Sequence, residues 1–312
     1  MGTTWAVKWI QPASPLVPAT VERRVTDRLE QLEQQFSTYR PNSVLSRFNR
    51  SSSTDWIAVP PELAGVAQQA RHLSALTGGA FDVTVAPLLQ LWGFGPAGPA
   101  ATSPTPTEIA TTRARVGWAR LEARLDPPAL RKTDPLLTAD LSSIAKSFAV
   151  DALSELLTAL GAPHHLVQIG GDVKAAGHGA DGRGWRVAIE QPVANARDFA
   201  RVVELADQAL STSGSYRNFV LIGGRPAGHI IDPRTGAPAA SALASVSVVQ
   251  DSCARSSALA TALFVLGPEE GYALAARDNL AGLFIVRDGA TLRQHPTPAF
   301  ATGADPILPH TR

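Results

Sequence analysis

The sequence predicts an α+β fold, in which helices pack against a mixed or antiparallel sheet. Helical periodicity dominates the first 160 residues or so, and short apolar runs of strand length cluster between residues 165 and 250. No regular alternation of strand and helix appears, and such an alternation would have favoured a doubly wound parallel sheet.

The helices are predicted from apolar residues at helical spacing. Pro61 and Gly78 delimit the second helix, Gly161 follows the third and Gly267 follows the fourth, in agreement with the preference for Pro at helix starts and Gly after helix ends. The expected helices are residues 21–36, 61–76, 144–160, 255–266 and 268–276.

The strands are predicted from short apolar runs that Gly, Pro or Asp bound. The expected strands are residues 4–10, 165–169, 185–189, 202–205, 219–222, 246–249 and 283–286. Residues 96–108 are rich in Pro, Ala, Ser and Thr, which predicts a surface loop or an insertion.

Composition excludes several classes of protein. The net charge of +1 argues against nucleic acid as the main partner, because phosphate binding needs a clear cationic surplus. No run reaches the roughly 18 apolar residues of a membrane span. Cys253 is the single cysteine, which excludes an intrachain disulfide and a cysteine-based metal site and is expected to be inert packing.

The N-terminal residues contain no long apolar signal segment. The sequence is therefore compatible with a cytoplasmic protein, or with an exported one whose upstream segment is missing from it. An initiating Met1 before a residue as small as Gly2 is expected to be removed. If Met1 has a role in the protein, this favours the second interpretation, an exported protein whose upstream segment is missing from the sequence.

Residues 209–236 form the densest polar region of the chain. Thr212 and Ser213 can donate and accept hydrogen bonds, and Gly214 allows close approach of a ligand to the backbone. His229 is a candidate proton carrier, and the turn Asp232–Gly236 fixes what precedes it. A polar hairpin would explain the region equally well if it stood alone.

Two other polar regions favour a binding site. Residues 77–84 (TGGAFDVT) offer a flat Phe81 and an acceptor Asp82, although a helix end leading into a core Phe is the simpler interpretation. Residues 140–146 (DLSSIAK) open a helix, where free N–H groups and Lys146 favour phosphate, and either Asp140 or Ser142 is expected as N-cap. Residues 170–172 (GGD) follow a strand and suit a turn or a close ligand approach.

Two motif matches point to other classes. Residues 177–182 (GHGADG) match the dinucleotide pattern but precede a strand, so we expect a hairpin loop there. Ser143 and Lys146 match the Ser-x-x-Lys motif of penicillin-recognising serine enzymes at the start of a helix. A serine acyl-transfer enzyme is therefore the alternative from another class.

Taken together, the polar regions resemble one family, the FAD:protein FMN transferases, once known as thiamine-biosynthesis lipoproteins. The resemblance spans almost the whole chain through ordered segments at residues 1–3, 39–49, 77–84, 91–95, 140–146, 170–172, 212–216, 229–236 and 258–263.

This resemblance implies a single domain over residues 1–312, with an α+β fold and an FAD cleft between lobes. It implies that FAD is the donor substrate, Mg²⁺ the cofactor, and an acceptor flavoprotein with a Ser/Thr-Gly-Ala-Thr/Ser-like motif the partner. FMN would be esterified to a Ser or Thr hydroxyl and AMP released.

The resemblance also assigns residues. FAD would be contacted by Met1, Ala80, Phe81, Asp82, Asp140, Lys146 and Ile231, and we add Thr212, Ser213 and Gly214 from the polar region above. His229 is the candidate base. The metal would be held by the Ser143 carbonyl, by Thr261, and by an aspartate four residues before Thr261.

Ser257 occupies the position of that aspartate. Mg²⁺ is usually anchored by one or two carboxylates, and a hydroxyl supplies an oxygen without charge. We therefore expect a weakened metal affinity that depends on FAD phosphates. Three functions are compatible with Ser257 at this position: an active transferase with a modified metal site, an FAD-binding relative with impaired transfer, or an FAD hydrolase.

Overall fold

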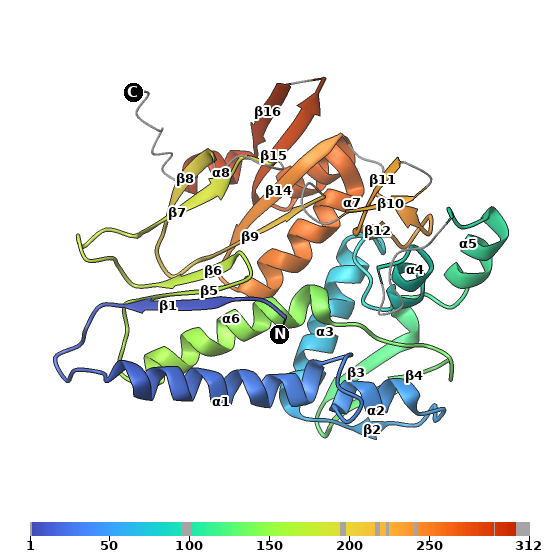
Figure 1. Cartoon of the computed structure of the whole chain (residues 1–312), viewed down its shortest axis with the longest axis horizontal. Helices are drawn as coiled ribbons and strands as arrows, with labels where there is room; N and C mark the ends of the chain where they lie inside the picture. Colours follow the sequence, from blue (N-terminus) through green and yellow to red (C-terminus); the bar gives the residue numbers. More distant parts are fainter. Residues whose placement is uncertain are drawn as a thin grey trace.

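A seven-stranded antiparallel sheet forms the centre of this computed structural model (Figure 1). The structure describes residues 2–94, 102–193, 198–215, 219–222, 225–239, 242–289 and 291–303. The strand order is β1-β5-β6-β9-β14-β15-β16, with every neighbouring pair antiparallel. Their bounds are β1 Trp5–Trp9, β5 His165–Ile169, β6 Asp172–Ala176, β9 Ala209–Gly214, β14 Leu243–Gln250, β15 Ala281–Asp288 and β16 Thr291–Pro296. The predicted α+β class is confirmed.

Two helices lie side by side on one face of this sheet (Figure 1). Helix α6 (Ser142–Ala159) contacts β5 and β6, and α7 (Cys253–Arg277) contacts β9, β14 and β15. Helix α1 (Pro18–Phe36) packs on α6, and α3 (Pro61–Leu76) touches both α6 and α7. No helix within the described ranges is long and apolar enough to cross a membrane.

Smaller sheets and short helices surround this centre. The sheets are β2 (Ile57–Ala58) with β4 (Pro128–Lys132) and β3 (Leu121–Leu125), β7 (Trp185–Glu190) with β8 (Phe199–Leu205), β10 (Phe219–Ile222) with β11 (Arg225–Gly228), and β12 (Ile231–Asp232) with β13 (Ala237–Pro238). The short helices are α2 (Val44–Arg50), α4 (Ala86–Leu91), α5 (Pro106–Arg113), the 3₁₀ turn η1 (Trp118–Arg120) and α8 (Pro298–Gly303).

Apolar side chains cover both faces of the central strands. Val246 and Val248 belong to the large core under α6 and α7, whereas Val249 belongs to a second core with Val203 of β8 and Phe300 of α8. Burial on both faces explains why β14 is a nearly continuous buried run rather than an alternating one.

All predicted helices and strands exist, and the predicted loop needs one correction. Residues 106–108 of the predicted loop belong to α5, which begins with a capping box between Thr105 and Glu108. Residues 95–101 lie outside the described part of the chain. The two predicted helices after residue 255 both lie within α7, and the predicted boundary between them is confirmed at Gly267, whose φ of 84° leaves the helical region just before Pro268.

The polar strands were not predicted. Strand β9 has the sequence ALSTSG and lies between β6 and β14, which satisfy its backbone groups. Its Thr212 hydroxyl is hydrogen-bonded to that of Ser247 on β14 at 2.7 Å. Residues 177–182 form a loop as predicted, but it joins β6 to β7, which lie in different sheets.

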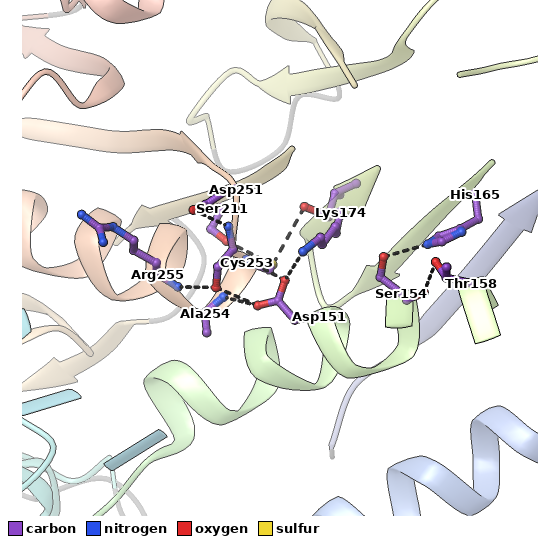
Figure 2. A network of polar contacts seen from close by, with 12 residues as sticks. Asp151, Ser154, Thr158, His165, Lys174, Ser211, Asp251, Cys253, Ala254 and Arg255 are labelled. Carbon is purple, nitrogen blue, oxygen red and sulfur yellow. Dashed lines mark hydrogen bonds and ion pairs between the residues drawn. The ribbon is translucent and has the colours of Figure 1, made fainter. Parts of the chain in front are cut away.

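One buried carboxylate joins the two central helices, as Figure 2 shows. Asp151 of α6 accepts hydrogen bonds from the first N–H groups of α7, at Cys253 (2.9 Å) and Ala254 (3.0 Å). It also accepts from the Ser252 hydroxyl (2.9 Å) and pairs with Lys174 of β6 (3.0 Å). Asp151 therefore fixes the start of α7 against α6 and β6.

Cys253, beside this carboxylate, is fully buried. Burial raises the pKa of its thiol well above the ordinary value, and the nearby carboxylates add to the effect. A buried thiol with a raised pKa is unreactive, in agreement with the packing role predicted for it.

Replacing Asp151→Asn is expected to lower the free energy of unfolding by about 2–4 kcal/mol, because the amide leaves Lys174 unpaired and caps α7 less well. Urea unfolding would measure the change. Asp251→Asn is the matched control, because Asp251 is exposed and its carboxylate accepts a hydrogen bond only from the Ser252 N–H among the described residues. Equal stability of the two variants would contradict the assigned role of Asp151.

His165 is buried and held in a neutral form. Its Nδ1 lies 2.7 Å from the Ala162 carbonyl oxygen and its Nε2 lies 2.7 Å from the Ser154 hydroxyl. Burial lowers the pKa of His165, and the bond to the Ala162 carbonyl only partly opposes this. The unfolded chain therefore binds the proton more readily than the folded protein does.

The free energy of unfolding is consequently expected to fall as pH drops below about 6.5, the pKa of an unfolded histidine. Above that pH the contribution of neutral His165 to stability is fully present. His165→Gln should reduce the difference in melting temperature between pH 7.5 and pH 5.5. Thermal unfolding monitored by circular dichroism at both pH values checks this. An unchanged difference would show that other groups govern the acid side.

Candidate active site

One cavity of about 1300 Å³ brings together every predicted site residue that the structure describes. It lies where β5 ends, β6 begins and β9 ends, beside the N-terminal parts of α6 and α7. The volume exceeds the roughly 300–1,000 Å³ of most small-molecule sites, so a dinucleotide fits. The predicted residues that line it are Ala80, Phe81, Asp82, Asp140, Ser143, Lys146, Thr212, Ser213, Gly214, His229, Ile231, Ser257 and Thr261.

Asp140 organises the start of α6. Its backbone N–H donates to the Val83 carbonyl at 2.6 Å, and its Oδ1 accepts from the N–H of Ser142 at 2.9 Å. The N-cap of the helix is Leu141, so the expectation that Asp140 or Ser142 occupies that position is wrong. Asp140 satisfies an N-terminal donor from one residue earlier, because its side chain reaches over Leu141.

The segment before Asp140 is anchored by two residues that sequence reasoning missed. Asn49 makes two hydrogen bonds of 2.8 Å with the backbone of Ala139, and Lys132 donates to the carbonyls of Asn49 and Leu137 at 3.1 Å each. Lys132 is fully buried, and burial lowers the pKa of its ammonium group. The only sequence signal was the place of Asn49 within the matched segment 39–49.

Lys146 places its ammonium group at the turn between β5 and β6. It pairs with Asp172 at 2.9 Å and donates to the Gly170 carbonyl at 3.2 Å. Asp172 is buried and also accepts from the Ser147 hydroxyl at 2.6 Å. Asp172 and Ser147 thus hold Lys146 beside the cavity; sequence reasoning had assigned neither of them a role.

The N-terminal segment packs against the same turn. Gly170 has φ +53°, and a Cβ there would lie 3.0 Å from the Thr3 side chain, so the close approach requires glycine. The Gly170 N–H donates to the Thr4 carbonyl at 3.0 Å, and both threonines line the cavity. Met1 lies outside the described residues, and its contact with FAD stays a prediction.

Residues 80–82 are more buried than a stacking platform requires. Phe81 is 2% exposed and belongs to the large core. The Asp82 carboxylate accepts from the N–H and hydroxyl of Thr84 (2.7 Å each) and from the N–H of Trp118 (3.0 Å). Burial raises the pKa of Asp82, and these hydrogen bonds oppose the shift. The carboxylate shapes this wall of the cavity, and its direct contact with a flavin stays a prediction.

The residues expected to hold the metal do come together. We call Ser143, Ser257, Thr261 and Ser213 the hydroxyl cluster. Ser257 donates its hydroxyl to the Ser143 carbonyl (3.1 Å), Thr261 donates to the Ser257 carbonyl (3.1 Å), and the Thr261 and Ser213 hydroxyls lie 3.1 Å apart. The cluster spans α6, α7 and β9, elements distant in sequence.

The donor set of this cluster does not fit a resident magnesium ion. Its oxygens are neutral, and Mg²⁺ in proteins is anchored by one or two carboxylates. No group of three His, Cys, Asp or Glu side chains that could hold a metal occurs among the described residues. The Asp172 carboxylate, which also lines the cavity, is already paired with Lys146.

His229 also lines the cavity, just before β12. Its ring packs edge-on against Phe94, with 6.4 Å between ring centroids. The following turn is tight, as predicted: the Gly236 N–H donates to the Asp232 carbonyl at 2.8 Å, and Asp232 holds Arg234 at 3.0 Å. The Asp232 turn thus fixes the segment that carries His229.

The turn is also tied to the short helix α4. The Trp92 indole N–H donates to the Gly236 carbonyl at 2.8 Å. Trp92 and Phe94 both come from the matched segment 91–95. This segment therefore supports the segment that carries His229. The sequence contained the motif but did not show that it contacts the His229 segment.

The Ser-x-x-Lys interpretation gains no support from this geometry. The Lys146 ammonium hydrogen-bonds to Asp172 and Gly170, and not to the Ser143 hydroxyl. A lysine acting as base for a serine nucleophile needs a direct hydrogen bond to it.

The cavity has two walls that the sequence did not predict. Tyr39 is 79% exposed and lines the cavity, as do five consecutive residues of β7, 186–190. Tyr39 opens the matched segment 39–49, but β7 has no local motif, because it reaches the cavity only through the folding of the β7–β8 hairpin.

Comparison with known proteins identifies the family. The model of the ApbE family matches residues 1–284. The chain is similar to the FAD:protein FMN transferases of Vibrio cholerae, 38% identical over 300 residues, and of Haemophilus influenzae, 37% identical over 294 residues. The alignments cover 96% and 92% of this chain and 89% and 84% of these relatives.

Solved structures agree. The flavin transferase ApbE from Vibrio cholerae matches with a TM-score of 0.88 at 38% identity, over 97% of this chain and 96% of that one. The apo form of the flavinyl transferase ApbE of Pseudomonas stutzeri matches with a TM-score of 0.88 at 39% identity, over 97% and 94%. On both the sequence and the fold, this chain belongs to the ApbE family.

Proposed function

We propose that this protein transfers FMN from FAD to a Thr or Ser hydroxyl of an acceptor flavoprotein and releases AMP. The observation that carries the proposal is the single cavity in which His229, Lys146 and the start of α6 meet. Family membership supports it, because relatives of 38% and 37% identity are FAD:protein FMN transferases. The acceptor segment is proposed to carry a Ser/Thr-Gly-Ala-Thr/Ser-like motif.

The binding step follows from charge. The diphosphate of FAD is an anion, and Ser142 and Ser143 line the cavity at the N-terminus of α6, where the helix dipole places a partial positive charge. Lys146 adds a full positive charge within the first turns of the same helix. On FAD binding, the Lys146 ammonium would share its hydrogen bonds between Asp172 and a phosphate oxygen.

The transfer step exchanges one P–O bond for another. The acceptor hydroxyl oxygen attacks the phosphorus of the FMN moiety, and the bridging P–O bond of the diphosphate breaks. AMP leaves with that electron pair, and the His229 imidazole takes the hydroxyl proton. The neutral donor set of the hydroxyl cluster gives no basis for a step through a resident Mg²⁺.

A specific observation favours a second candidate, an FAD-binding relative with impaired transfer. Ser257 stands where the family resemblance implies a metal-binding aspartate, and the cluster around it is neutral. Both candidates use the same FAD pocket, so FAD binding cannot distinguish them and only transfer can.

Incubation with FAD, Mg²⁺ and an acceptor domain bearing the motif is expected to add the mass of FMN less water to the acceptor, with AMP released. His229→Ala should slow this transfer by about 10²–10⁴-fold and leave FAD binding within a few-fold, because only the proton acceptor is lost. His72→Ala, an exposed histidine on α3, is the matched control. Intact-mass spectrometry over a time course measures the rates.

Other outcomes identify the alternatives. FAD bound without transfer would support the impaired relative, and FMN and AMP released without acceptor modification would indicate an FAD hydrolase. Absence of FAD binding would contradict the proposed function.

Lys146→Ala should weaken FAD binding by about 10–100-fold, the worth of one hydrogen bond to a charged group. The effect should shrink at high salt, because part of it is Coulombic. Flavin fluorescence titration measures the affinity, with Lys8→Ala, an exposed lysine on β1, as the control. Equal affinity of the two variants would remove Lys146 from the diphosphate site.

A further inference from the structure

The direction of one hydrogen bond distinguishes the hydroxyl cluster from a metal site. Ser257 of α7 donates its hydroxyl proton to the Ser143 carbonyl of α6, with 3.1 Å between the two oxygens. A serine hydroxyl can donate, whereas an ionised carboxylate can only accept. The carbonyl that faces α7 therefore receives a proton directly from the protein.

A carboxylate at the same position would reverse this relation. The carbonyl oxygen and the carboxylate oxygens would be acceptors turned toward each other, and their repulsion is relieved only by a cation between them. The hydroxyl of Ser257 removes the repulsion without a cation. It forms between α6 and α7 the bridge that a metal would otherwise form.

The rest of the cluster is also satisfied internally. The Thr261 hydroxyl donates to the Ser257 carbonyl one turn earlier in α7 and lies 3.1 Å from the Ser213 hydroxyl. The hydroxyl protons of Ser257 and Thr261 are thus both donated to carbonyl oxygens of the protein, and no oxygen of the cluster carries a negative charge that would attract a cation.

The surrounding charges do not favour a divalent cation. Among the hydrogen bonds and ion pairs of Asp140 and Asp172, none reaches the hydroxyl cluster: Asp140 accepts from Ser142, and Asp172 accepts from Ser147 and Lys146. Lys146 stands one turn after Ser143 on α6 and contributes a positive charge to the same cavity.

We propose that the Ser257 hydroxyl replaces a divalent cation as the bridge between α6 and α7, so that the free protein holds no resident metal ion. The inference rests on the proposed function only in assigning the cluster to the FAD diphosphate site. A metal ion that accompanies FAD would then be brought by the phosphates and would not be stored by the protein.

The test compares the wild-type protein with Ser257→Asp and Ser257→Ala, all stripped of metal with EDTA and free of FAD. Mn²⁺ is titrated as the probe, and the free ion is followed by electron paramagnetic resonance. The wild type and Ser257→Ala should bind Mn²⁺ at least about tenfold more weakly than Ser257→Asp, the lower end of the usual loss when a metal-site group is changed.

Thermal unfolding provides a second readout. In EDTA, Ser257→Asp should have a melting temperature about 2–4 °C below that of the wild type. The reason is that its carboxylate and the Ser143 carbonyl, both hydrogen-bond acceptors, would face each other. Mn²⁺ should restore its melting temperature and leave those of the wild type and Ser257→Ala unchanged. Ser257→Ala should melt below the wild type with or without metal, because it only loses the bridge.

Stoichiometric Mn²⁺ binding by the metal-stripped, FAD-free wild-type protein would overturn the proposal. The wild-type titration alone decides this even if Ser257→Asp fails to fold. A separate FAD titration in EDTA keeps the two proposals distinguishable: loss of FAD binding would contradict the proposed function and leave the metal measurement intact.

Discussion

The position of Asp151 is the constraint on which the site depends. Its carboxylate receives two N–H groups from the start of α7 while it stands on α6 and pairs with Lys174 of β6. These contacts fix the distance and angle at which the two helices meet beside the sheet. Ser143 and Lys146 come from one of these helices and Ser257 and Thr261 from the other, so the shape of the cavity follows from this junction.

Electrostatics then divides the cavity into two kinds of surface. The turn between β5 and β6 carries a charged pair, Lys146 with Asp172, which can exchange a carboxylate partner for a phosphate. The hydroxyl cluster beside it is neutral and internally hydrogen-bonded. The lysine and the helix terminus attract an anion, whereas the hydroxyl cluster contains no carboxylate that would hold a divalent cation.

Sequence reasoning succeeded where a local pattern sufficed. Helix α3 has its predicted bounds because Pro61 and Gly78 delimit it, and β5 has its predicted bounds because a glycine follows a short apolar run. It failed for β9, whose hydroxyl-rich sequence is stabilised by two neighbouring strands. There tertiary contacts override local propensity.

The sequence by itself determined which chemical groups the protein has: the segments that match the family, the histidine before a tight turn, and a serine in place of a carboxylate. Only the tertiary structure decided how those groups act on one another. Asp172 and Ser147 hold Lys146, Asn49 and Lys132 anchor the segment before Asp140, and Ser257 donates to Ser143. The physical reason is that a hydrogen bond depends on distance and direction, and residues far apart in sequence acquire both only when the chain packs.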